Sequence, residues 1–150
     1  MKNKKILFVC TGNTCRSPMA EIILKRKLKT AGIEGVKVSS AGLMAEVGSK
    51  INQNSVQALK QLGYRAGAFK SKQITPSMLK RSELVICMTQ EQKRYLYGYK
   101  RVYSMGEVTG LSDISDPFGR GFDAYVHASK QIEQACEIII NELIKVKGDK

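Results

Sequence analysis

Proline and tryptophan are scarce in this sequence, and long apolar runs are missing. With 3 Pro, 13 Gly and no Trp among 150 residues, and with 25% charged residues, the chain is neither collagen-like nor disordered. No stretch approaches the roughly 20 apolar residues of a membrane-spanning helix, and the apolar run at residues 6–10 is too short for a secretory signal. We therefore expect one domain over residues 1–150 that stays in the cytoplasm without membrane contact.

Metal-ligating residues are also few. The chain has four cysteines and one histidine. A zinc site needs about four ligands, whereas only Cys10 and Cys15 lie near each other and the lone His127 is far away in sequence. Without an export signal, the even number of cysteines indicates thiols rather than disulfides. We expect no metal and no cofactor, and at least one cysteine that is chemically active.

Acidic residues are outnumbered by basic ones. Lys and Arg total 25 against 13 Asp and Glu, so the net charge is +12 and the surface attracts anions. Nucleic acids, acidic membranes and phosphorylated substrates are all anionic. The basic clusters at residues 2–5 and 25–29 also fit ordinary solvated helix faces, so charge alone does not choose among these partners.

Strand and helix patterns alternate along the chain. Residues 6–9 form an apolar run typical of a strand buried on both faces. After a polar loop, Ser17 and Pro18 predict a helix with Ser17 as its N-cap, ending near Gly32. Further strands are expected at residues 36–39 and 84–88, and at residues 101–104 on a sheet edge. Further helices are expected at residues 56–62, from residue 75, from residue 89 and around residues 132–143. A loop is expected over residues 106–121.

This alternation predicts an α/β fold, a three-layer αβα sandwich in which parallel strands are joined by right-handed crossovers. Ligands of such sheets bind beyond the carboxyl ends of the strands, near the point where the strand order reverses. The loop at residues 10–17, which follows the first strand, is therefore the expected binding site.

Cys10 and Arg16 occur in that loop as Cys-x5-Arg, with Ser17 next. The spacing has little specificity alone, but here it lies between a buried strand and a helix N-terminus, where backbone N–H groups and the helix dipole form a nest for an anion. Gly12 allows unusual dihedrals, and Arg16 can fork onto two phosphate oxygens. The same field favours a thiolate at Cys10, to which Ser17 can donate a hydrogen bond. The loop is thus predicted to bind phosphate and to supply a nucleophile.

Phosphoryl transfer through a cysteine also needs a proton donor for the leaving group and a base for the attacking water. Asp116 is the candidate, because Pro117 restricts the backbone after it and Phe118 can wall off a pocket. An ordinary turn before proline is the alternative for Asp116. Asp113 fits a turn, and Asp123 fits a helix start.

Residues 9–21, residues 40–42 and residues 116–119 resemble the low-molecular-weight protein tyrosine phosphatase family in order and spacing. The resemblance covers almost the whole chain. It implies a four-stranded parallel sheet, a phosphocysteine intermediate and no metal, with phosphorylated proteins as substrates, inorganic phosphate as product and a monomeric enzyme. The resemblance implies that Cys10 is the nucleophile, that Arg16 binds the phosphate and that Ser17 is the partner of the thiolate. It implies that Asp116 is the general acid and base and that Ser40 supports Asn13. The implied substrate-binding residues are Thr11, Gly12, Asn13, Thr14, Cys15 and Phe118.

Within this family, the chain resembles the bacterial protein arginine phosphatases more than the tyrosine-specific members. The latter commonly carry Ile at the position of Thr14 and two aromatic residues after Asp-Pro, where this chain has Phe118 and Gly119. A planar, polar guanidinium suits the Thr14 hydroxyl and the Asp116 carboxylate. The alternative is that Thr14 only fills the loop and that the enzyme acts on phosphotyrosine.

Positions 69 and 15 each allow two interpretations. Many relatives place a histidine that supports the loop asparagine where this chain has Phe69. Cys15 shares the loop with Cys10, and thiolates oxidise readily, so a reversible Cys10–Cys15 disulfide is one expectation, which the resemblance also implies. A small side chain packed beneath the loop is the other.

Three further functions compete with a phosphatase. An arsenate reductase on the same fold requires a relay of cysteines, but Cys87 ends a buried strand and Cys136 falls on the apolar side of the last helix. A nucleic-acid-binding module would explain the net charge but leaves the cysteine loop without a role. A phosphate sensor would lack a nucleophile or an acid, and this chain has both. We therefore expect a phosphatase with no nucleic-acid partner.

Overall fold

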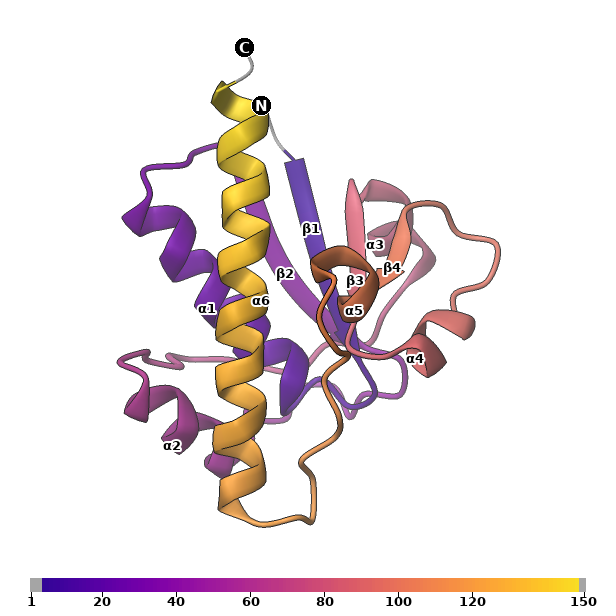
Figure 1. Ribbon diagram of the computed structural model, residues 1–150. Coiled ribbons are helices and arrows are strands. Elements are labelled where there is room, and N and C mark those ends of the chain that lie inside the picture. The colour runs from indigo at the N-terminus through magenta and orange to yellow at the C-terminus, as the bar shows by residue number, and fades with distance from the viewer. Residues whose placement is uncertain (1–3, 149–150) are drawn as a thin grey trace.

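A four-stranded parallel sheet forms the centre of the protein (Figure 1). The computed structural model describes residues 4–148, so residues 2 and 3 of the basic cluster at residues 2–5 lie outside the described residues. The strands are β1 (Lys4–Cys10), β2 (Val36–Gly42), β3 (Leu84–Cys87) and β4 (Val102–Ser104), in the order β2-β1-β3-β4. The predicted α/β class, the parallel pairing and the edge position of the last strand are confirmed.

Helices cover both faces of this sheet, as the uninterrupted apolar run of β1 predicts. The helices are α1 (Arg16–Thr30), α2 (Gln53–Gln61), α3 (Pro76–Arg81), α4 (Gln90–Arg94), α5 (Met105–Thr109) and α6 (Phe122–Gly148). Within the described residues, none is long and apolar enough to cross a membrane.

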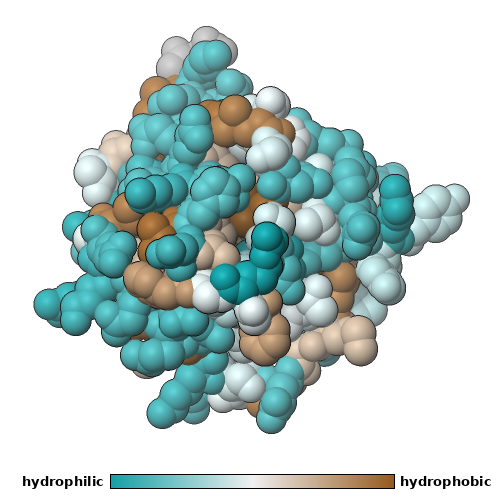
Figure 2. Space-filling model, turned by 60° about the horizontal axis from the view of Figure 1, so that its bottom comes forward, coloured by the Kyte–Doolittle hydropathy of each residue, from teal (hydrophilic) through white to brown (hydrophobic). Residues whose placement is uncertain are grey.

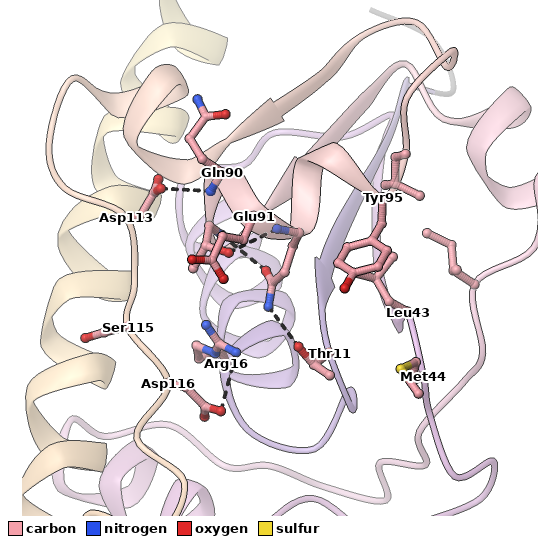
Figure 3. A pocket seen from close by; sticks show the side chains of 14 residues that line it. Thr11, Arg16, Leu43, Met44, Gln90, Glu91, Tyr95, Asp113, Ser115 and Asp116 are labelled. Atoms are coloured by element: carbon pink, nitrogen blue, oxygen red, sulfur yellow. Dashed lines mark hydrogen bonds and ion pairs between the residues drawn. The ribbon is translucent and has the colours of Figure 1, made fainter.

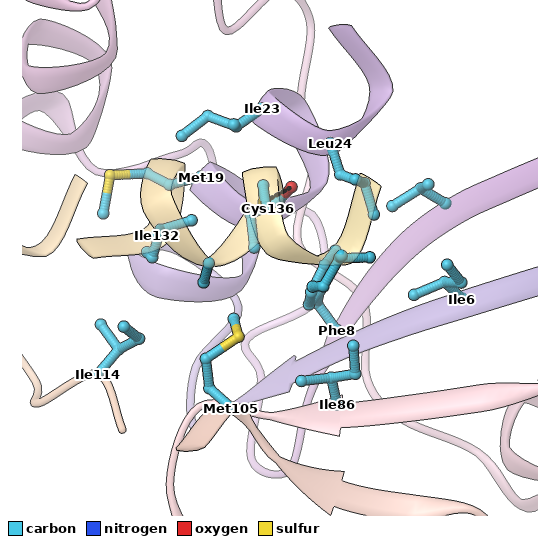
Figure 4. Packing of buried hydrophobic residues seen from close by; sticks show 14 of the residues in the cluster. Ile6, Phe8, Met19, Ile23, Leu24, Ile86, Met105, Ile114, Ile132 and Cys136 are labelled. Carbon is cyan, nitrogen blue, oxygen red and sulfur yellow. Dashed lines mark hydrogen bonds between the residues drawn. The ribbon is translucent and has the colours of Figure 1, made fainter. Parts of the chain in front are cut away.

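Successive side chains of β1 enter different cores, because side chains alternate across a strand. Ile6 and Phe8 join the larger cluster, which is packed with residues of α1 and α6 such as Met19 and Ile132 (Figure 4). Leu7 and Val9 join a smaller cluster on the opposite face, together with Leu79 of α3 and Leu96. Burial on both faces fixes β1 at the centre of the molecule.

The position of β1 also determines where a ligand can bind. The chain proceeds from β1 to β2 on one side and then to β3 and β4 on the other, so the strand order reverses beside β1. The β1–α1 loop lies at the carboxyl ends of the strands, at the lower end of the sheet in Figure 1. The predicted site therefore lies at the switch point of the sheet.

Two local predictions are wrong. Ser17 is not the N-cap of the first helix, which begins at Arg16 with Cys15 at the N-cap and no side-chain cap. Residues 106–121 are not all loop, because α5 begins after Ser104, which forms a capping box with Glu107. The capping box predicted at Thr89 and Gln92 is present and opens α4.

Candidate active site

The β1–α1 loop is held in a tightly defined shape. Asn13 has a φ of 58°, a left-handed conformation that asparagine tolerates better than most residues. Gly42 of β2 lies directly against the loop: a Cβ there would come within 2.7 Å of the Thr11 carbonyl oxygen and 3.0 Å of the Asn13 amide nitrogen. The backbone amides of Met44 and Asn52 donate to the carbonyls of Thr11 and Thr14, each at 2.8 Å. The loop is therefore fixed by segments distant in sequence.

A chain of buried hydrogen bonds reaches Cys10 from inside the molecule. Asn13 Nδ2 donates to Ser17 Oγ at 2.8 Å and to Ser40 Oγ at 2.9 Å. Ser17 Oγ also lies 2.8 Å from Cys10 Sγ. Because Ser17 accepts from Asn13, its hydroxyl proton is available to the cysteine sulfur. This tertiary contact is the reason why Ser17 does not cap α1.

Two further partners of this network were not predicted from the sequence. Ser40 Oγ donates to Glu21 Oε1 at 2.6 Å, and Lys25 Nζ lies 2.6 Å from the other carboxylate oxygen of Glu21. The backbone amide of Lys72 donates to Asn13 Oδ1 at 2.9 Å. Glu21 lies in residues 9–21, which resemble the family, but the spacing of residues in the sequence does not predict that its side chain is buried. The Lys72 contact could not be anticipated because it involves a backbone group.

The Lys72 amide also answers the question raised by Phe69. Asn13 is braced by a backbone donor, so a histidine is not needed for this bond. Phe69 instead packs against the larger hydrophobic cluster. The Lys72 segment is brought to the loop by a short parallel bridge between Gly42 and Gln73.

Arg16 and Asp116 meet at the mouth of the loop. Arg16 Nη1 donates to the Ile114 carbonyl oxygen at 2.9 Å, and Arg16 Nη2 lies 3.8 Å from Asp116 Oδ2. The Asp116 side chain is 56% exposed, whereas the guanidinium is buried. Asp116 Oδ1 accepts the backbone amide of Phe118 at 3.1 Å. A buried cation and an exposed carboxylate therefore face the same opening.

A small cavity of about 230 Å³ brings the loop residues together with the Asp116 segment. The exposed position of Asp116 allows exchange of protons with solvent, and the N-terminus of α1 favours an anion. Eight of the predicted site residues line this cavity: Cys10, Thr11, Gly12, Thr14, Cys15, Arg16, Asp116 and Phe118. Asn13, Ser17 and Ser40 lie behind it in the hydrogen-bond network.

Asp113 binds backbone amides of two helices. Its two carboxylate oxygens accept the backbone amides of Gln90, at 3.0 Å, and Gly106, at 2.7 Å. It thus joins the first turns of α4 and α5. Asp123 lies in the first turn of α6, where a carboxylate interacts favourably with the helix dipole.

All four cysteines are free thiols. Cys15 Sγ lies 3.8 Å from the Thr14 hydroxyl and donates to Tyr125 Oη at 3.8 Å. Burial raises the pKa of the Cys15 thiol, and it raises the pKa of Cys87 to about 12. Cys87 and Cys136 are fully buried, which does not suit a mobile cysteine relay. In the described part of the chain, no group of three His, Cys, Asp or Glu residues could hold a metal ion.

A second, larger cavity opens beside the first and was not predicted. Its volume is about 750 Å³, and Thr11, Arg16 and Asp116 line both cavities (Figure 3). Gln92 of α4 donates from Nε2 to the Thr11 hydroxyl at 3.2 Å, which connects the wall of the larger cavity to the loop.

Known proteins resemble this chain over nearly its whole length. The family described as low molecular weight phosphotyrosine protein phosphatase matches residues 5–148. The protein-arginine-phosphatase of Bacillus subtilis is 35% identical over 147 residues, covering 93% of this chain and 97% of that protein. The low molecular weight protein-tyrosine-phosphatase PtpB of Staphylococcus haemolyticus is 36% identical over 133 residues, covering 85% and 91%. The solved structure of the YwlE arginine phosphatase from Geobacillus stearothermophilus has a TM-score of 0.87 and 32% identity, covering 97% and 96%.

Proposed function

The chain belongs to the low molecular weight phosphotyrosine protein phosphatase family and is a phosphoprotein phosphatase, and from this premise we propose that it hydrolyses phosphoarginine in proteins. Identity alone does not separate the two substrate classes, because relatives named for arginine and for tyrosine are 35% and 36% identical to it. The proposal therefore depends on the side chains around the cavity.

In the proposed reaction, Cys10 Sγ attacks the phosphorus atom and displaces the substrate nitrogen, which leaves with a proton from Asp116. Arg16 and the N-terminus of α1 hold the phosphoryl oxygens. Asp116, now a carboxylate, accepts a proton from water, whose oxygen attacks the phosphocysteine. The sulfur leaves as a thiolate stabilised by Ser17, and inorganic phosphate is released.

The geometry supports these roles. The 2.8 Å separation between Cys10 Sγ and Ser17 Oγ suits a hydroxyl that stabilises a thiolate as nucleophile and as leaving group. The exposed carboxylate of Asp116, 3.8 Å from Arg16, faces the opening through which a leaving group must pass. General acids and bases act on groups within hydrogen-bond reach, and Asp116 lines the same small cavity as Cys10.

The proposal of phosphoarginine as substrate depends mainly on Thr14. It lines the small cavity, so its hydroxyl lies in the wall that a substrate side chain meets. A guanidinium has several N–H donors, and a buried donor without an acceptor is costly. Thr14 and Asp116 both line this cavity and can supply oxygen acceptors.

Phosphotyrosine is the second candidate, and Phe118 is the observation that favours it. Phe118 lines the cavity and is 69% exposed, so its ring can pack against a phenyl ring. It is the only aromatic residue among the residues that line this cavity, so a phenyl ring would have an aromatic partner on one side only. The single aromatic partner and the oxygen atoms of Thr14 and Asp116 favour the guanidinium.

The test is a side-by-side assay of the purified, chelator-treated enzyme on matched peptides that carry phosphoarginine or phosphotyrosine. We expect hydrolysis of both in the presence of chelator, with the higher kcat/KM for the phosphoarginine peptide. A higher kcat/KM for the phosphotyrosine peptide would overturn the arginine assignment. Loss of activity on chelation would contradict the metal-free mechanism.

A further inference from the structure

The larger cavity is a groove that continues from the small catalytic cavity. It has about three times the volume, 750 Å³ against 230 Å³, and it shares Thr11, Arg16 and Asp116 with it. Figure 3 shows Arg16 and Asp116 toward one end of the groove, and Leu43, Met44 and Tyr95 toward the other. Because the two cavities share Thr11, Arg16 and Asp116, a polypeptide whose phosphorylated side chain enters the small cavity can place a neighbouring side chain in this groove.

One wall of the groove is apolar although it faces solvent. Met44, which follows β2, and Tyr95, which ends α4, are each 78% exposed. Leu43, Ile74 and Leu96 form the deeper part of the same wall. Exposed apolar side chains that gather in a concavity are typical of binding sites, and methionine adapts its shape to different partners.

Elsewhere on this end of the molecule, apolar residues are dispersed. In Figure 2, which brings this end of Figure 1 forward, hydrophobic residues occur as small areas separated by hydrophilic ones. The groove wall is therefore a local feature rather than part of a broad apolar surface. Its size suits one or two side chains better than a protein face.

The other side of the groove is polar and includes Glu91. Glu91 is exposed and forms no ion pair within the described residues, whereas the nearby Asp113 carboxylate is occupied by two backbone amides. The Gln92 side chain is buried and bonded to Thr11, so this side is fixed to the catalytic loop. An acidic side chain entering the groove would meet the Glu91 carboxylate, which is unfavourable.

We propose that this groove is a substrate subsite that takes an apolar side chain close in sequence to the phosphorylated residue and rejects an acidic one. The inference rests on the proposed phosphatase function, because it assumes a polypeptide bound through its phosphorylated side chain. A second copy of this chain does not suit the groove, since it would cover Arg16 and Asp116 and so block the catalytic cavity.

The experiment measures kcat/KM for short phosphopeptides that carry Leu, Ala or Glu at each of the two positions before and after the phosphorylated residue. At one or more positions, we expect Leu to be preferred over Ala by about tenfold, which is the usual value of filling an apolar pocket, and Glu to be the poorest. The same series is synthesised with phosphoarginine and with phosphotyrosine.

Two groove variants, Tyr95→Ser and Met44→Ser, are expected to lose most of the preference for Leu. Tyr97→Ser is the matched control, because Tyr97 lies two residues from Tyr95, is 94% exposed and does not line the groove. It should keep the full preference. Turnover of p-nitrophenyl phosphate by each preparation verifies that the variants are folded and active.

Equal kcat/KM for Leu and Ala at all four positions would overturn the subsite, and so would groove variants that retain the preference. Concentration-dependent dimerisation that Tyr95→Ser abolishes would also overturn it, because a second copy would then occupy the groove. If only phosphotyrosine peptides are hydrolysed, the arginine assignment fails, but the preference for Leu is still measured on them. The two proposals can therefore fail separately.

Discussion

The Ser17 hydroxyl could either cap α1 or contact Cys10, and it contacts Cys10. Local preference would use this hydroxyl to cap α1, but Asn13 and Cys10 engage it at 2.8 Å each. The uncapped first turn leaves the helix N-terminus to the anion, and the hydroxyl serves the cysteine sulfur instead. At the scale of single residues, the Ser17 hydroxyl therefore contacts the proposed nucleophile instead of capping the helix.

Asp116 gives the first prediction at this scale. Asp116→Asn should lower kcat/KM, which reports the step that expels the leaving group, by about two to four orders of magnitude on phosphoarginine and phosphotyrosine peptides, the usual contribution of a general acid. The loss should be smaller for p-nitrophenyl phosphate, whose leaving group needs no proton. Steady-state kinetics on the three substrates measure this difference. An equal loss on all three would assign Asp116 to binding rather than to proton transfer.

Thr14 gives a prediction about specificity. In Thr14→Ile, guanidinium donors lose an acceptor while a phenyl ring gains apolar contact. An unpaired buried donor costs about 1–3 kcal/mol, or roughly one to two orders of magnitude in rate. The kcat/KM should therefore fall for phosphoarginine and rise for phosphotyrosine. If both values fall together, Thr14 only maintains the loop.

At the scale of elements, β2 shapes the catalytic loop through Gly42. Gly42→Ala would place a Cβ within 2.7 Å of the Thr11 carbonyl oxygen, so the loop backbone must shift. We expect a large loss of kcat/KM and a destabilisation of about 1–3 kcal/mol, as is typical of overpacking. Ser39→Ala in the same strand is the control and should keep both values. Unchanged kinetics in Gly42→Ala would show that the loop tolerates the displacement.

The elements could largely be predicted from the sequence because their signals are local. The apolar run of β1, the capping box at Thr89 and the proline at the start of α3 appear where expected. The same is true of the Cys10 to Arg16 loop, which depends on a strand followed by a helix. Short patterns therefore sufficed for the sheet and for the position of the loop between β1 and α1.

What could not be predicted depends on contacts between distant segments. Glu21 became part of the loop network only because β2 brings Ser40 to it, and the Lys72 amide reaches Asn13 from 59 residues away. The capping box of α5 was a local signal that the long polar segment obscured. The groove beside the site joins residues of the β2, α3 and α4 regions, which no single pattern connects.

At the scale of the whole molecule, the net charge of +12 should act on substrate capture. Long-range attraction of an anionic phosphopeptide weakens as salt screens it. We expect kcat/KM for a strongly acidic phosphopeptide to fall as ionic strength rises, with kcat nearly constant. A peptide of the same length with no net charge should respond less. Equal salt responses of the two peptides would show that the overall field does not contribute to capture.

The central claim is that Cys10 accepts the phosphoryl group directly from phosphoarginine. Rapid-quench mass spectrometry of the unmodified enzyme, mixed with a phosphoarginine peptide, tests it most directly. The account predicts a transient phosphoryl group on the fragment that contains Cys10, formed as the free arginine peptide appears and lost as inorganic phosphate is released. Hydrolysis of the peptide with no phosphorylated enzyme, or with the phosphoryl group on another residue, would contradict the account.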